Sequence, residues 1–169
     1  MVASSSLDLP AAVSELLSRR TESVVLPSVG ADVQPSLDSS GRWMAFTSSA
    51  DFLEGDRNGT ATDVFLRDLH SGTVTRISHQ FGGPESGNGA SHSAQITPNA
   101  QWVIFVSEAS DLVADDANNT SDVFAWHRES GEIQLVSGTQ QGYSGNATSM
   151  HPVVSGEGRH VLFTSFASD

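Results

Sequence analysis

Two short segments of the sequence carry side chains that could bind a hard metal ion. Asp56-Arg-Asn58 is followed by Asp63, and the same Asp-x-Asn spacing recurs later in the chain, again followed by an Asp. Oxygen ligands one residue apart, closed by a later carboxylate, suit Ca²⁺. Both segments have fewer side-chain oxygens than a full calcium loop and lack its closing bidentate Glu. The alternative is an Asx-turn that orders the loop before the next strand. Both hypotheses stay open for Asp56, Asn58, Asp63, Asp116, Asn118 and Asp122.

The sequence offers no recognisable catalytic motif. It contains no cysteine, which excludes a thiol nucleophile and a thiolate metal site. The stretch Gly142-Tyr-Ser-Gly-Asn146 lacks the spacing of a Gly-x-Ser-x-Gly nucleophile elbow. The adjacent carboxylates of Asp115 and Asp116 lie in a polar segment, where solvation is the simpler interpretation. We therefore expect a protein that is not an enzyme and has no cofactor, with calcium the one exception left open.

Composition excludes two classes of partner. The 169 residues include 8 Lys and Arg against 20 Asp and Glu, a formal net charge of −12. Nucleic-acid binding depends on basic side chains that displace counterions from phosphates, so neither nucleic acid nor an anionic membrane surface is expected as a partner. Apolar runs such as residues 102–106 are far shorter than the ~20 residues of a membrane helix, so no membrane insertion is expected. Residues 1–6 contain no Lys or Arg, so we expect no signal peptide in this chain.

A repeat of almost sixty residues organises most of the chain. Three segments align with one another: residues 35–46, 94–105 and 152–163. Phe46, Phe105 and Phe163 occupy equivalent positions, 59 and 58 residues apart. A second block, Asp-Val-Phe, recurs with the same period at residues 63–65 and 122–124. A constant period held by separate blocks indicates a repeat architecture.

Each repeat unit reads as four short strands, which predicts an all-β fold. In the first unit the expected strands are residues 35–37, 43–48, 63–69 and 73–78. Asp38-Ser-Ser-Gly41 and His70-Ser-Gly72 supply tight turns between them. Four antiparallel strands cannot bury both faces of their sheet alone, whereas copies arranged around an axis can. The sequence therefore predicts blades of a β-propeller.

The predicted blades do not add up to a closed ring. Blades 35–78 and 94–137 are complete, while 21–28 and 152–169 are partial. A closed propeller needs about 4–8 blades. We therefore expect residues 21–169 to form an incomplete ring, as a fragment of a larger propeller. Self-association of copies through open blade edges is the alternative.

Residues 1–20 lie outside the repeat and are expected to form a short helix. Asp8 can cap its start, Pro10 suits its first turn, and Arg19 and Arg20 favour its C-terminal end. Its apolar residues have helical spacing, so one face should pack against another surface. That surface is either the open propeller edge or a partner protein.

The repeat resembles the WD-like propeller repeat of the TolB type. The resemblance rests on Pro35, Gly41 and Ala45-Phe46, followed by Asp63-Val-Phe65, and covers most of the chain. The later units depart from the pattern at Ala94, Ala100 and His160. The resemblance implies a protein-binding or scaffolding module in the periplasm or outside the cell. It leaves open two alternatives: part of the gating propeller of a larger serine hydrolase, and a calcium-stabilised adhesion module.

The connections between units are the preferred binding surface. Residues 79–93 and 138–151 are long and rich in Gly, Ser, Asn and Gln. Connections of this length without structure of their own are usually functional or mobile. His92 and His151 precede or begin the expected first strands, which line the central channel of a propeller. We expect another protein as the partner.

Overall fold

The computed structural model describes residues 35–50 and 53–169, and every regular element in them is a β-strand. The predicted helix of residues 1–20 and the partial blade 21–28 lie outside the described residues. Within the described ranges, no helix is long and apolar enough to cross a membrane.

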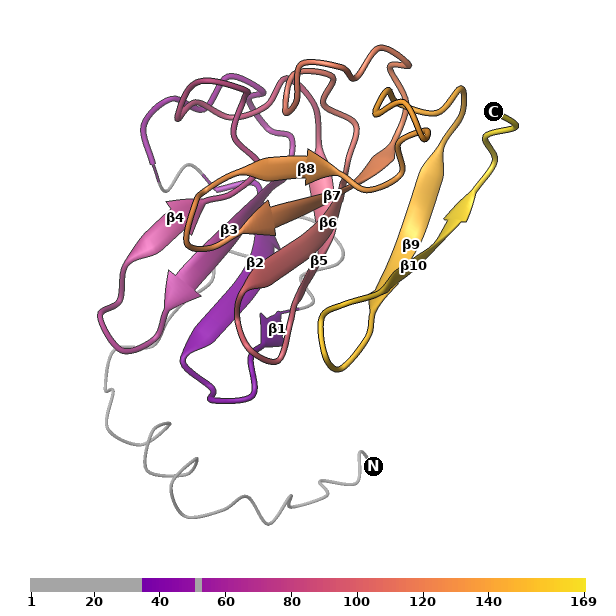
Figure 1. Ribbon diagram of the computed structural model, residues 1–169. Helices are drawn as coiled ribbons and strands as arrows, with labels where there is room; N and C mark the ends of the chain where they lie inside the picture. Colours follow the sequence, from indigo (N-terminus) through magenta and orange to yellow (C-terminus); the bar gives the residue numbers. More distant parts are fainter. Residues whose placement is uncertain (1–34, 51–52) are drawn as a thin grey trace, which may run out of the picture.

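Three antiparallel sheets follow one another along the chain (Figure 1). The first contains β1 (Ser36–Leu37), β2 (Trp43–Ser48), β3 (Asp63–Asp68) and β4 (Val74–Arg76). The second contains β5 (Ser91–Ile96), β6 (Trp102–Ser107), β7 (Asp122–His127) and β8 (Ile133–Leu135). The third contains β9 (Ser149–Val154) and β10 (Val161–Ser165). Strand order in both four-stranded sheets is sequential, which confirms the predicted blades of four antiparallel strands.

Equivalent residues of the two complete blades have equivalent partners. Phe46 pairs with Phe65 across β2 and β3, and Phe105 pairs with Phe124 across β6 and β7. The ring centroids are 5.5 Å apart in the first pair and 5.8 Å apart in the second, and both pairs are stacked. The repeat seen in the sequence is therefore a repeat of strand register.

The core consists of apolar layers between successive sheets. The pleat of β6 sends Val103 and Phe105 into one layer together with Leu66 of the first sheet. Ile104 of β6 lies in a second layer, against which Val154 of the third sheet packs. The middle sheet is thus covered on both faces.

Strand β3 is buried on both of its faces. The alternation of residues 63–69 predicts a half-buried strand, yet Val64, Phe65 and Leu66 are all at most 2 % exposed. Val64 and Leu66 face the layer shared with the second sheet. Phe65 faces the other way, where it stacks on Phe46 and lies 5.9 Å below the guanidinium of Arg76. Both faces of the strand are therefore covered.

The third sheet leaves apolar side chains exposed. Val153 and Leu162 are register partners and are 59 % and 74 % exposed. Phe163 is 37 % exposed, although its equivalents in the complete blades are at most 1 % exposed. In the complete blades the third strand pairs with the second strand and covers these Phe side chains. Among the described strands, β10 has no third strand beside it.

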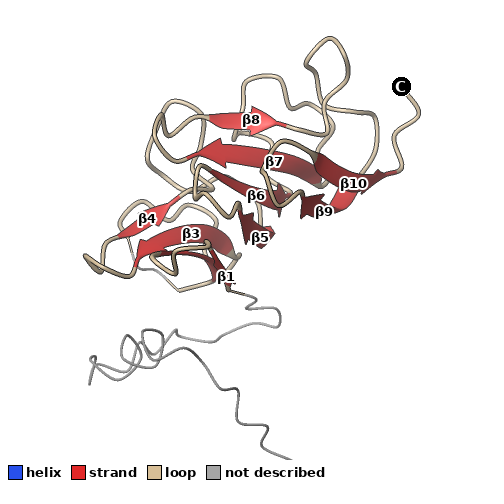
Figure 2. Cartoon of the chain, turned by 60° about the horizontal axis from the view of Figure 1, so that its bottom comes forward, coloured by secondary structure: helices blue, strands red, loops and turns tan. Residues whose placement is uncertain are grey.

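Long connections and short turns lie at opposite ends of the sheets. Figure 1 shows the β2–β3 and β4–β5 connections at the top and the β1–β2 and β3–β4 turns at the bottom. The N–H of Ser86 donates to the carbonyl of Gly55 over 2.9 Å, which joins the two connections of the first blade. The first strands lie in a row, with β5 between β1 and β9, as Figure 2 shows from below. We call the end with the long connections the loop end.

Candidate functional site at the loop end

Asp56 forms the Asx-turn predicted as one alternative for its loop. Its Oδ1 accepts hydrogen bonds from the N–H groups of Asn58 at 3.0 Å and Gly59 at 3.2 Å. The hydroxyl of Ser86, from the β4–β5 connection, donates to the same oxygen over 3.4 Å. The carboxylate thus orders its own loop and ties it to the neighbouring one.

Asp63, the first residue of β3, is 3 % exposed and has several partners. Its Oδ1 accepts from the hydroxyl of Ser78 at 2.7 Å and from the Asn58 amide at 3.4 Å. Its Oδ2 lies 3.5 Å from Nε of Arg76, an ion pair whose Nε makes no hydrogen bond. Burial raises the pKa of Asp63, and the Ser78 hydroxyl and the Arg76 charge oppose that rise. The positive charge that balances the Asp63 carboxylate is therefore the Arg76 side chain.

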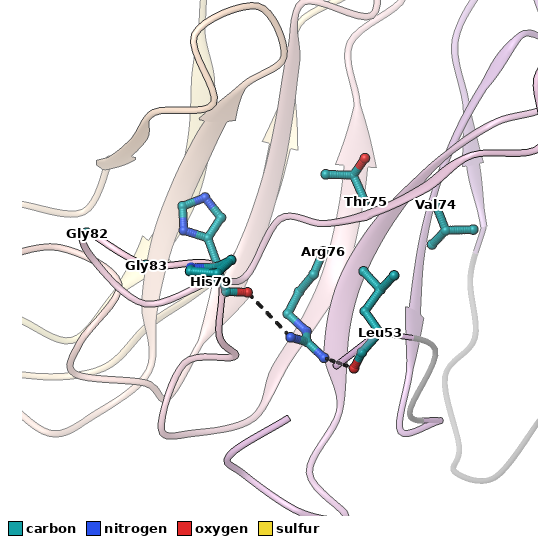
Figure 3. Close-up of a pocket in the computed structure, with 8 residues that line it drawn as sticks. Leu53, Val74, Thr75, Arg76, His79, Gly82 and Gly83 are labelled. Carbon is teal, nitrogen blue, oxygen red and sulfur yellow. Dashed lines mark hydrogen bonds between the residues drawn. The ribbon is translucent and has the colours of Figure 1, made fainter. Parts of the chain in front are cut away.

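Arg76 lies beside an open pocket of about 500 Å³ at the edge of the first blade (Figure 3). The pocket is lined by Leu53, Val74, Thr75, Arg76, His79, Gly82, Gly83 and Pro84. Arg76 is only 5 % exposed, and its guanidinium donates to the carbonyls of Leu53 at 3.1 Å and Glu54 at 3.2 Å. Its donors therefore hold the surrounding loops together and are not directed at a ligand.

The second blade repeats the same arrangement around Asp122. Asp122 is fully buried, and its Oδ1 accepts from the hydroxyl of Ser137 at 2.6 Å. The amide of Asn118 donates to its Oδ2 at 2.6 Å and to the carbonyl of Gly145 at 2.7 Å. In each blade the Asn of the Asp-x-Asn segment thus donates to the later Asp.

The two blades differ in what balances the buried charge. Leu135 occupies the β8 position that corresponds to Arg76 in β4, so Asp122 has no such ion pair. Asp116 is 9 % exposed, and neither of its carboxylate oxygens has a hydrogen-bond partner. Burial, followed by the negative charge of Asp122, raises its pKa. The N–H of Asn118 and the hydroxyl of Ser144 oppose this rise, although neither is placed to make a hydrogen bond.

Whether these six residues bind calcium stays a prediction. Within the part of the chain that the structure describes, no three side chains of His, Asp or Glu gather as a metal site. Each cluster instead combines two carboxylates with neutral oxygens.

A second repeated motif escaped the sequence analysis. The side chain of Asn88 accepts from the N–H of Ser110 at 2.9 Å and donates to its hydroxyl at 3.1 Å. Asn146 makes the same two bonds with Ser168, at 3.0 and 3.1 Å. Each Asn thus joins the connection after the fourth strand of one sheet to the segment that follows the second strand of the next sheet. The signal was available, because Ser-Gly-Asn recurs at residues 86–88 and 144–146.

The long connections have structure of their own, contrary to expectation. Isolated bridges join His79 to Ser86 and Gly138 to Ser144, so each connection begins as a small hairpin. Phe81 and Tyr143 project from these hairpins and are 68 % and 59 % exposed. The candidate binding surface therefore carries two exposed aromatic rings on ordered backbone.

The first strands carry backbone that is unusual for their residue types. Ser93 and His151 have φ of 57° and 54°, at equivalent positions of β5 and β9. Both line a pocket of about 250 Å³ between these strands. His92 does not line this pocket, and its Nδ1 lies 2.9 Å from Oγ of Ser93, within hydrogen-bond distance. The pocket contains only one of the two histidines that the sequence placed near the channel.

Solved structures are the known proteins that this chain resembles. No family model and no curated protein matches the chain. Among solved structures, TolB from Acinetobacter baumannii matches with a TM-score of 0.55 and 19 % identity, over 83 % of this chain and 28 % of that one. A putative TolB from Agrobacterium tumefaciens matches with a TM-score of 0.54 and 15 % identity, over 84 % of this chain and 41 % of that one. The chain thus spans less than half the length of either structure, and TolB is a β-propeller. Together with the sequential four-stranded sheets, these matches show that the chain has a TolB-type β-propeller fold.

Proposed function

We propose that this chain is a non-enzymatic protein-binding module that holds its partner at the loop end. The observation that carries the proposal is the pair of exposed aromatic side chains, Phe81 and Tyr143, on neighbouring blades. Aromatic residues are enriched at protein interfaces and often dominate their energetics. The TolB-like fold supports an interaction module as the general class.

The backbone that presents the two rings is fixed in the free protein. The N–H of Phe81 donates to the carbonyl of Asp111 at 2.7 Å, and the carbonyl of Tyr143 accepts from the N–H of Thr139 at 2.8 Å. The N–H of Ser144 donates to the carbonyl of Asp115 at 3.2 Å. A rigid frame lowers the entropy that binding would otherwise cost.

Charge defines the partner further. The net charge of −12 favours association with a partner that carries a basic patch around an apolar contact. In this proposal the chain forms part of a longer propeller, and that protein works as a scaffold in the periplasm or outside the cell.

A capture experiment with paired variants tests the proposal. The double substitution Phe81→Ser/Tyr143→Ser removes both rings from an exposed surface, so the fold should persist, as circular dichroism would show. Leu37→Ser, which removes an apolar side chain that is 55 % exposed on β1, is the matched control. We expect a partner that crosslinks to the wild type and the control to be lost with the double variant. Equal capture by all three proteins would refute the loop end as the binding surface.

A further inference from the structure

We propose that the second blade binds one Ca²⁺ ion at its loop end, with Asp116 and Thr120 as direct oxygen ligands and Asp122 as the neighbouring negative charge. The first blade, in this proposal, uses Arg76 in place of the ion. The proposal goes beyond protein binding and selects one of the two segments that share the Asp-x-Asn pattern.

Asp116 is the first observation. The residue is 91 % buried, and both carboxylate oxygens are fully enclosed without a hydrogen-bond donor. Leaving an ionised carboxylate buried without a partner is costly, so such a group is ordinarily paired, coordinated to a metal or protonated. The hydroxyl oxygen of Thr120 is also buried without a partner. Two side chains of one loop, four residues apart in the sequence, thus have buried oxygens that make no hydrogen bond.

The first blade shows how the same loop looks when it is satisfied. Its Asp56 accepts three hydrogen bonds, from the N–H groups of Asn58 and Gly59 and from the Ser86 hydroxyl. The segment between the Asn and the later Asp is one residue shorter in the second blade. The hydroxyl of Ser144 corresponds to that of Ser86, and each accepts from a backbone N–H of its loop, at 2.9 Å and 2.7 Å. Only the Ser86 hydroxyl also donates to the Asp of its loop, whereas that of Ser144 gives no hydrogen bond to Asp116.

The two blades also differ in how the charge of the later Asp is balanced. In the first blade the Arg76 guanidinium lies 3.5 Å from Asp63 and neutralises it. In the second blade Leu135 stands at that position, and the side-chain donors to Asp122 among the described residues are the neutral Ser137 and Asn118. Two buried carboxylates therefore lie at the two ends of one loop, and no cationic side chain among the described residues pairs with either. A divalent cation would remove this imbalance.

The donor set selects the kind of cation. Carboxylate and hydroxyl oxygens without sulfur or imidazole suit a hard ion, and Ca²⁺ accepts a flexible set of 6–8 oxygens that includes carbonyls and water. The low number of side-chain ligands places the site in the weak class, with a dissociation constant on the order of 10⁻⁴–10⁻³ M.

Calcium titration by calorimetry, on protein treated with a chelator and then dialysed, tests the proposal. The wild type should bind one Ca²⁺, and about 1 mM Ca²⁺ should raise its melting temperature, because an ion that binds only the native form stabilises it. Asp116→Asn should weaken binding about tenfold or more, since calcium affinity depends on the charge of its ligands. Asp56→Asn, the equivalent change in the satisfied loop, is the matched control and should leave calcium affinity unchanged.

A transplanted arginine gives an independent test. Leu135→Arg places at β8 the residue that β4 has at the same position, and the new guanidinium should pair with Asp122 and weaken calcium binding by a similar factor. If Asp116→Asn does not fold, Thr120→Val provides the loss-of-ligand variant. The proposal is overturned if the wild type binds no Ca²⁺ up to about 10 mM, ten times the weakest affinity of such modules. It is equally overturned if Asp56→Asn weakens calcium binding as much as Asp116→Asn does. A third contrary result is a melting temperature that rises when the pH is lowered but does not change when Ca²⁺ is added.

Discussion

Ser137 makes two buried hydrogen bonds in the second blade, and its removal gives a sharp stability prediction. Its hydroxyl donates to Oδ1 of Asp122 at 2.6 Å and accepts from the N–H of Val123 at 3.0 Å. Asp122 and Val123 are both fully buried, so water cannot replace the lost hydroxyl. Ser137→Ala leaves one donor and one acceptor unpaired.

The expected cost follows from these two orphaned groups. An unsatisfied buried polar group costs about 1–3 kcal/mol, and more when it is charged. We therefore expect Ser137→Ala to lower the free energy of unfolding by roughly 3–4 kcal/mol. In that variant Asp122 keeps the Asn118 amide. Ser78→Ala breaks the same pair of bonds in the first blade, but Asp63 keeps an ion pair with Arg76 as well as the Asn58 amide. Its cost should be smaller by about 1 kcal/mol, the value of a typical retained interaction.

Urea unfolding, with calcium chelated in every sample, measures both costs. The slope of free energy against urea concentration should stay unchanged, so that a shifted midpoint reports stability. Ser130→Ala, at an exposed turn, is the control and should stay within about 0.5 kcal/mol of the wild type. The reasoning fails if Ser137→Ala matches the Ser130 control, or if Ser78→Ala is the more damaging of the two changes.

Four further substitutions have defined outcomes. Phe105→Ala should cost about 3–5 kcal/mol of unfolding free energy in urea, because the fully buried ring leaves a cavity, whereas Phe163→Ala, at a side chain 37 % exposed, should cost about 1–2 kcal/mol. Gly89→Ala should lower the thermal midpoint, since a Cβ there would lie 2.7 Å from backbone atoms of residues 108 and 109; an unchanged midpoint would show that this backbone yields freely. Hydrogen bonds from Arg42 hold the pKa of Asp68 well below its usual range, so this pair stabilises the fold above about pH 4 and the benefit is lost as the pH falls. The stability difference between wild type and Arg42→Gln should therefore shrink in acid, and a constant difference between pH 6 and pH 2 would contradict the assignment.

The blades could be predicted from the sequence because the residues that repeat in it occupy equivalent register positions in the strands. Phe46 and Phe105 recur with the Asp-Val-Phe block, and the structure pairs each with the Phe of its block. The expected limits of the second strand, residues 43–48, agree with the structure. The fourth strand, Val74–Arg76, is shorter than the expected residues 73–78. The first strand of the second unit is longer, because it begins at Ser91 within the connection.

The chemistry of the candidate site could be predicted only in part. The Asp-x-Asn spacing placed Asp63 near Asn58, but the ion pair with Arg76 depends on the β3–β4 register, which brings residues far apart in the sequence together. The replacement of Arg76 by Leu135 is visible in the aligned sequence, yet it has no meaning until that register is known. The positive φ of Ser93 has no signal at all in its residue type, because it arises from the bulge between His92 and Gln95.

The apolar layers on both sides of β6 have a consequence for how the molecule opens. Because Phe105 packs toward the first sheet and Ile104 toward the third, amide protons of β6 and β7 can exchange with solvent only when both layers separate. The β9–β10 sheet depends on a single layer and should open far more often. Protection against exchange will therefore be highest in the middle of the chain and fall toward residue 165, as in a stack whose members are stabilised by their immediate neighbours.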